Sequence, residues 1–146
     1  MTFWIVLVLV FALIIGNMLM LRPSAEDRAL GAQREKAGAA GFHVHLREAP
    51  GWLELPVGER LVACYQLAQA TPADHLGRWR WHAGIGSWQR VDGDRHWPGQ
   101  VPWPTPAPAG WLGVEAVADG VTVYWREDGR AESVDLMLNV LQQSGA

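Results

Sequence analysis

Two short stretches of the chain carry residue types that could bind a metal ion or a charged partner. The first is Phe42-His-Val-His-Leu46, in which His43 and His45 would share one face of a strand. A zinc site needs four ligands. The others would have to come from scattered residues, namely His75, His82, His96, Cys64 or a carboxylate. The alternate apolar positions require the buried face, so the pattern favours water-exposed strand histidines.

The second stretch is Arg78-Trp-Arg-Trp-His82, which combines cations with aromatic rings. Proteins that bind single-stranded nucleic acids use basic residues for phosphate and aromatic rings for stacking. The net charge of −3 argues against that class, since such domains are basic overall. As a strand, the stretch places Trp79 and Trp81 on one face, which we assign to the core. The other face carries Arg78, Arg80 and His82, which we predict as a candidate partner-binding surface.

The sequence holds no common catalytic or nucleotide-binding motif, such as a Gly-x-Ser-x-Gly elbow, a phosphate loop or a dinucleotide fingerprint. Gly84-Ile-Gly86 joins two predicted strands, and no helix follows it. Cys64 lies in an apolar segment, which is typical of an inert buried thiol. We predict no catalytic, cofactor-binding or metal-binding residue, no small-molecule substrate and no nucleic-acid partner. The alternative is a small enzyme or ligand-binding domain tethered to a membrane.

Residues 1–21 contain no charged side chain, and Phe3–Leu21 is almost wholly apolar. At about 1.5 Å per residue, these residues would span roughly 28 Å as a helix, close to the apolar thickness of a bilayer. Trp4 and Arg22 suit the two membrane interfaces. A cleaved signal peptide would normally begin with a positive region, which is missing here. We therefore predict a transmembrane helix over 1–21, with the lipid bilayer as one partner.

Positive residues follow the apolar segment, and no Lys or Arg precedes it. Because positive flanks stay in the cytoplasm, we predict an N-terminus outside the cell and a cytoplasmic C-terminal domain at the bacterial inner membrane. The lone Cys64 agrees with a reducing compartment. The residues assigned to the membrane interface are Trp4, Arg22, Arg28, Arg34 and Lys36.

Residues 22–41 are predicted to form a basic juxtamembrane segment. Pro23 ends the membrane helix, and Ser24 with Asp27 has the spacing of a capping box for a helix from about Ala25 to Ala37. Its apolar face is thin, so the helix could lie on lipid headgroups or stand in solvent. Gly38 and Gly41 end it.

The residues from 42 to 146 read as one α+β domain with a small, mostly antiparallel sheet. Val114–Trp125 has the pattern of a hairpin, with Asp119-Gly120 expected in a type I′ turn. The last segment, about Ala131 to Gln143, has the apolar stripe of a helix packed on the sheet. Further strands are predicted at Phe42–Leu46, Arg60–Leu67, Arg78–His82 and Trp88–Val91.

A loop rich in proline and tryptophan, residues 97–110, interrupts the domain. Five prolines between Pro98 and Pro108 enforce an extended path. A domain of this size cannot easily bury every tryptophan, so Trp97, Trp103 and Trp111 are predicted to face a partner or the membrane. The loop itself could be a ligand for a proline-binding module, but its composition favours a path over the domain with Trp103 tucked under the sheet.

The layout of residues 1–40, with one span, the Arg22-Pro23 step and a basic helix, resembles the small auxiliary subunit of the bacterial SecDF preprotein translocase. The chain also resembles uncharacterised single-pass inner-membrane proteins of proteobacteria that share an Arg-Pro-Ser step. These resemblances imply no site residue. We therefore predict a non-catalytic single-pass protein with a cytoplasmic partner-binding domain. Its partner would be a membrane protein, and its role that of an accessory subunit of a membrane complex.

Overall fold

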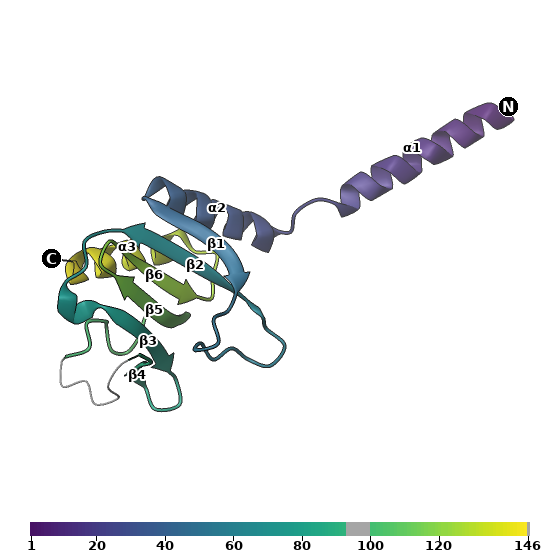
Figure 1. Ribbon diagram of the computed structural model, residues 1–146. Helices are drawn as coiled ribbons and strands as arrows, with labels where there is room; N and C mark the ends of the chain where they lie inside the picture. The colour runs from purple at the N-terminus through teal and green to yellow at the C-terminus, as the bar shows by residue number, and fades with distance from the viewer. Residues whose placement is uncertain (93–99, 146) are drawn as a thin grey trace.

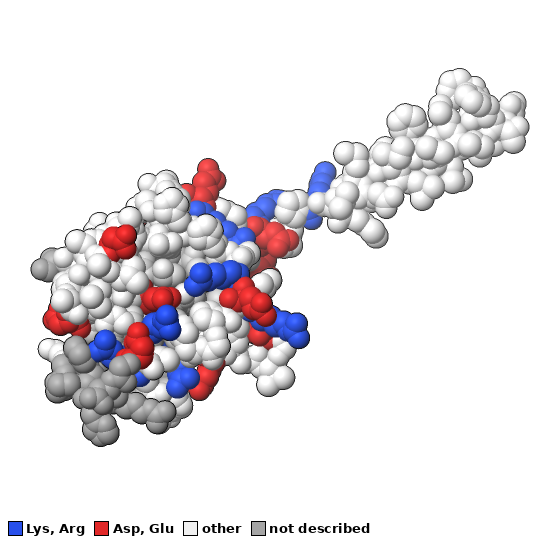
Figure 2. Space-filling model, in the orientation of Figure 1, with Lys and Arg blue, Asp and Glu red and all other residues white. Residues whose placement is uncertain are grey.

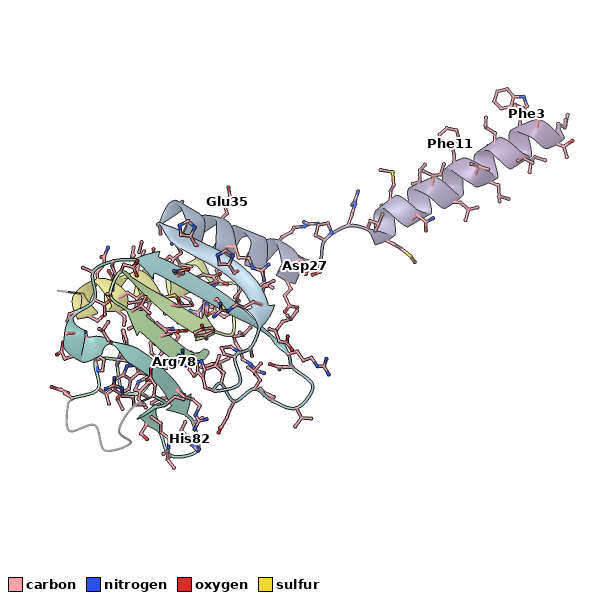
Figure 3. All side chains as sticks on the ribbon, viewed as in Figure 1. Phe3, Phe11, Asp27, Glu35, Arg78 and His82 are labelled. Atoms are coloured by element: carbon pink, nitrogen blue, oxygen red, sulfur yellow. The ribbon has the colours of Figure 1, made fainter. Side chains whose placement is uncertain are left out.

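An isolated apolar helix precedes the folded domain in the computed structural model, which describes residues 1–92 and 100–145 (Figure 1). This helix, α1 (Thr2–Met20), buries none of its residues in the protein. Among the described residues, it is the one helix long and apolar enough to cross a membrane. The side chains of Phe3 and Phe11 point away from the helix into open space (Figure 3).

The second helix, α2 (Ala25–Ala39), begins with the predicted capping box. Ser24 Oγ accepts a hydrogen bond from the Asp27 backbone N–H at 3.0 Å, and Asp27 Oδ2 accepts one from the Ser24 N–H at 3.0 Å. These bonds pair backbone donors that a helix N-terminus otherwise leaves free. The helix does not stand apart from the domain, as the sequence allowed, because Ala37 is buried in the core shared with the sheet.

Six antiparallel strands form the sheet, in the spatial order β1-β2-β6-β5-β3-β4, which confirms the predicted α+β class. The two tryptophans of the Arg78–His82 stretch lie on β3, one face of which packs in the core. The strands are β1 (Phe42–Glu48), β2 (Leu61–Ala68), β3 (Gly77–His82), β4 (Ser87–Arg90), β5 (Trp111–Val117) and β6 (Gly120–Trp125). A short 3-10 turn (Ala73–His75) precedes β3.

One face of the sheet packs against α2 and the C-terminal helix α3 (Ala131–Ser144), which passes behind the strands in Figure 1. The predicted stripe of α3 is confirmed, with Val134, Met137 and Leu141 fully buried. The strands contribute large side chains to this core, including Tyr65 and Trp125, whose rings meet edge-on at 5.2 Å between centroids. Aromatic rings bury much area per residue, and they make up a large part of this core.

The hairpin between β5 and β6 is confirmed, but its turn differs from the prediction. Val117 pairs with Gly120, so the two turn residues are Ala118 and Asp119, and neither has a positive φ. Gly120 belongs to the strand, where an added Cβ would lie 3.3 Å from the Leu67 carbonyl oxygen. The residue at position 120 is therefore a glycine because the strand packs closely against β2, and not because a type I′ turn requires one.

Candidate interaction surface

The sheet face opposite the helices carries mostly polar side chains, and we call it the polar face. Strand pairing fixes its membership, because alternate residues point to the same side and partners across strands share a face. Arg78 pairs with Glu115, Glu115 with Thr122, and Thr122 lies beside Gln66. The polar side chains of this face are His43, His45, Arg47, Gln66, Arg78, Arg80, His82, Gln89, Glu115, Thr122 and Tyr124.

A loop of residues 49–60, the covering loop, folds over one end of the polar face. Leu53 is buried there, and the Trp52 ring stands edge-on to the Tyr124 ring at 5.3 Å between centroids. Gly113 makes this approach possible, since a Cβ at that position would lie 2.6 Å from Leu53 Cδ2. The sequence offered only a short run of apolar residues as a signal for this covering loop.

Arg80 connects the covering loop to the sheet through hydrogen bonds and an ion pair. Its guanidinium donates to the Trp52 carbonyl oxygen at 3.3 Å and to Gln89 Oε1 at 3.0 Å, and it lies 3.2 Å from Glu54 Oε1. The position on the outer face agrees with the prediction from the Arg-Trp alternation. These contacts, however, give Arg80 partners within its own chain.

A row of hydrogen bonds crosses the polar face from β1 to β3. Arg47 donates to the Tyr124 hydroxyl, which donates in turn to Glu115 Oε2 at 2.8 Å. Arg78 Nε donates to the other Glu115 oxygen at 3.3 Å. Burial raises the pKa of the Tyr124 hydroxyl, and its bond to the Glu115 carboxylate raises it further. The tyrosine therefore stays protonated and fixes the orientation of Glu115.

Arg78 is the more accessible arginine of the predicted pair, with 47% of its side chain exposed. Its backbone N–H donates to Asp92 Oδ1 at 2.8 Å, which fixes the chain leaving β4. An open groove of about 320 Å³ lies here. It is lined by Leu76, Gly77, Arg78, Asp92, Glu115, Ala116, Val117 and Ala118. Figure 3 shows Arg78 and His82 at different places along β3.

The histidines are spread over the polar face. His43 and His45 are exposed on β1, as predicted from the buried positions of Phe42 and Val44. His82 is partly buried at the other end, and its Nδ1 has no hydrogen-bond partner. No group of three or more His, Cys, Asp or Glu side chains within the described residues could hold a metal ion. Burial raises the pKa of the Cys64 thiol, and the nearby Arg47 opposes that rise.

The tryptophans are distributed differently from our expectation. Trp79 is buried in the core and Trp81 packs partly against it, which confirms their inward orientation. Trp103 and Trp111, which we expected to face a partner or the membrane, are each only 4% exposed, and Trp103 has the covered position predicted for the loop. The segment from 100 to 110 folds back under the sheet, where the Trp88 indole N–H donates to the Pro104 carbonyl oxygen at 2.9 Å. Trp97, the third residue of that predicted cluster, lies outside the described residues.

The residues assigned to the membrane interface fall into two groups. Trp4, Arg22 and Arg28 are exposed on α1, the linker and the start of α2. Arg34 and Lys36 instead contact the domain.

Arg34 makes a two-pronged pair with Glu127, at 2.8 Å from Nε and 2.6 Å from Nη2, and Tyr65 donates to the same carboxylate at 2.7 Å. Lys36 Nζ lies 2.6 Å from Asp135 Oδ2. The contact with Glu127 raises the pKa of Arg34.

Sequence reasoning did not identify Gln33, which joins α2 to the turn before α3. Its amide nitrogen donates to Asp128 Oδ1 at 2.7 Å and to the Arg130 carbonyl oxygen at 2.8 Å. Its amide oxygen accepts from the Gly129 N–H at 3.1 Å. A helix whose apolar face is mostly alanine gives no pattern from which this buried glutamine could be recognised.

A family profile described as a protein of unknown function (DUF2897) matches residues 1–28. The match covers α1, the linker and the first residues of α2. No curated protein and no solved structure matches the chain. At its N-terminus the chain is thus similar to a family of unknown function, in a segment that contains a candidate membrane-spanning helix.

Proposed function

We propose that this chain is a single-pass membrane protein whose domain binds another protein through the polar face. In this role it would be a non-catalytic accessory subunit of a membrane complex, with a membrane protein as its partner. The observation that carries the proposal is the Arg78–Glu115 pair beside an open groove, held in place by the hydrogen-bonded row across the sheet.

The chemistry of the face favours a protein partner over other ligands. Acidic and basic side chains are intermingled on the side of the domain that Figure 2 shows, and Arg78 and Arg80 are each paired with a carboxylate. Nucleic acid requires a basic surface. The groove beside Arg78 is open rather than enclosed, whereas small-molecule sites bury most of their ligand. A face with exposed donors and acceptors suits the polar contacts of a reversible protein interface.

The proposed membrane topology rests on α1 and its flanks. Its 19 residues reach about 28 Å, and no charged side chain interrupts them. The cations that follow at Arg22 and Arg28 favour a cytoplasmic domain and an N-terminus outside, at the inner membrane of a bacterial cell. Alkaline phosphatase fused after Ala146 should be inactive. Activity there would overturn this orientation.

Site-specific photo-crosslinking tests the binding face in native membranes. A benzoylphenylalanine at Gln66 on the polar face should give a defined adduct with one protein. The same probe at Leu136, an exposed residue of α3 on the opposite side, is the matched control. Arg78→Glu should abolish the Gln66 adduct, because it places a carboxylate beside Glu115. Equal adducts at both probe positions, or an adduct that survives Arg78→Glu, would contradict the proposal.

A further inference from the structure

A tight turn in the covering loop holds a valine side chain that is fully exposed and is not covered by any other part of the domain that the structure describes. The Glu59 N–H donates to the Pro56 carbonyl oxygen at 3.1 Å, and Gly58 takes a φ of +93°. Positive φ at the third position is the requirement of a type II turn, which glycine meets at low cost. Val57, at the second position, is fully exposed. The turn geometry therefore fixes an apolar side chain in an outward position.

Two exposed leucines lie on the strands that the covering loop connects, and Val57 is four residues before one of them. Leu61, at the start of β2, is 65% exposed, and Leu46, near the end of β1, is 52% exposed. We call Leu46, Val57 and Leu61 the apolar rim. The two leucines line an open groove of about 330 Å³. The groove also includes Leu30, Leu55 and Leu112. An exposed apolar groove on a folded domain is a candidate contact site, and Val57 lies on the covering loop, which runs directly into β2.

The apolar rim lies at the end of the domain where α1 is attached. Leu30 of α2 lines the groove, and it is only five residues beyond the helix start at Ala25. Residues 21–24 join α1 to α2, and four residues reach at most about 14 Å when extended. Figure 1 shows the loop between β1 and β2 on the side of the domain from which the linker emerges. A bilayer that holds α1 must therefore lie close to the apolar rim.

We infer that Leu46, Val57 and Leu61 insert into the interface of the same bilayer that α1 spans. This inference rests on the membrane anchoring in the proposed function. The short connection to α1 already keeps the domain at the bilayer surface. Inserting the apolar rim into that surface therefore costs no further loss of the domain's translational freedom.

Unpaired cations lie near the rim, and the two acids that line the groove, Glu59 and Glu127, are paired with Arg126 and Arg34. Arg22, Arg28 and Arg60 are exposed and form no ion pair with the described residues. Cations close to an anionic leaflet are attracted to it. The inferred contact would also direct the polar face, on the sheet beside the rim, to a fixed height above the membrane.

Fluorescent labels on the full-length protein in vesicles of phosphatidylcholine and phosphatidylglycerol test this inference. In a Cys64→Ala background, single cysteines at Val57 and at Val117 carry the environment-sensitive dye NBD. Val117 is a matched control, because it is an exposed valine at the last position of β5, at the opposite end of the sheet. A third label at Leu13, within α1, reports whether the anchor is in lipid.

The label at Val57 should show a blue-shifted emission and be quenched by spin-labelled lipid at least twofold more than the label at Val117. With the label moved to Leu61, Val57→Asp should reduce its quenching to the level at Val117, while the domain stays folded because Val57 makes no packing contact. Quenching at Leu13 with none at Val57 would overturn the inference and leave the anchor intact. No quenching at Leu13 would overturn both the inference and the proposed anchoring.

Discussion

The assignment of the two faces of β3 makes a quantitative prediction for Trp79→Ala. The Trp79 side chain is 1% exposed, and it lies beneath the Arg90 guanidinium, 5.7 Å from the ring centroid. A buried tryptophan removes about 200 Å² from water, which at about 25 cal/mol/Å² corresponds to roughly 5 kcal/mol. Alanine keeps part of that burial, so we expect a loss of about 3–5 kcal/mol in the free energy of unfolding. This is a large part of the 5–15 kcal/mol typical of a domain.

The assay is urea unfolding of the full-length protein in detergent micelles, followed by near-ultraviolet circular dichroism. That signal reports the packed aromatic side chains of the domain, whereas an isolated apolar helix contributes little to it. Arg78→Ala is the matched control on the same strand. Its exposed ion pair with Glu115 should contribute about 1 kcal/mol or less. A loss below about 1 kcal/mol for Trp79→Ala, or equal losses for the two variants, would refute the assignment of faces.

Three further predictions follow from packing, pairing and burial. Gly113→Ala should cost about 1–3 kcal/mol and increase proteolysis of the covering loop, because an added Cβ overlaps that loop; unchanged cleavage would contradict the close approach. Glu127→Ala should cost about 1.5–3 kcal/mol in the same urea assay, since it removes the partner of Arg34 and Tyr65, and wild-type stability would contradict the pairing. Cys64 should react with iodoacetamide far more slowly in the native protein than in urea. Burial raises the pKa of the Cys64 thiol, so the folded state keeps the thiol proton to a higher pH than the unfolded state does. This contribution to stability is present below the unfolded pKa, about 8.5, and is lost as the pH rises through the folded value. Equal rates of reaction in both states would contradict this burial.

The elements that could be predicted are those in which the residue pattern depends on local contacts or on which face of one element meets the core. Strict alternation in Arg78–His82 requires opposite environments for adjacent residues, and the structure has tryptophans inside and arginines outside. The stripe of α3 and the Ser24–Asp27 capping box were predicted for the same reason. Each pattern depends on contacts within one element or with one face, so local sequence is enough to recognise it.

The elements that could not be predicted depend on contacts distant in sequence. Trp111 looked like a surface residue because it follows a proline-rich loop, yet strand pairing places it opposite Trp125 in the core. Asp119-Gly120 has the composition of a type I′ turn, but the register with β2 requires the glycine within the strand. The sequence pattern identified both features as unusual and assigned each to the wrong physical cause.

Some properties of this protein follow from the sequence alone, because they need no tertiary partner. An apolar segment of 19 residues without a charged side chain forms a helix suited to a bilayer wherever the domain lies. Tertiary structure decided that α2 belongs to the domain, since Gln33 and Arg34 find their partners near residue 128, almost 100 positions later. It also decided that Arg34 and Lys36 are paired with acids of the domain, whereas Arg22 and Arg28 are exposed. Folding decides which side chains pair within the chain, because such partners lie far apart in the sequence and no local pattern brings them together.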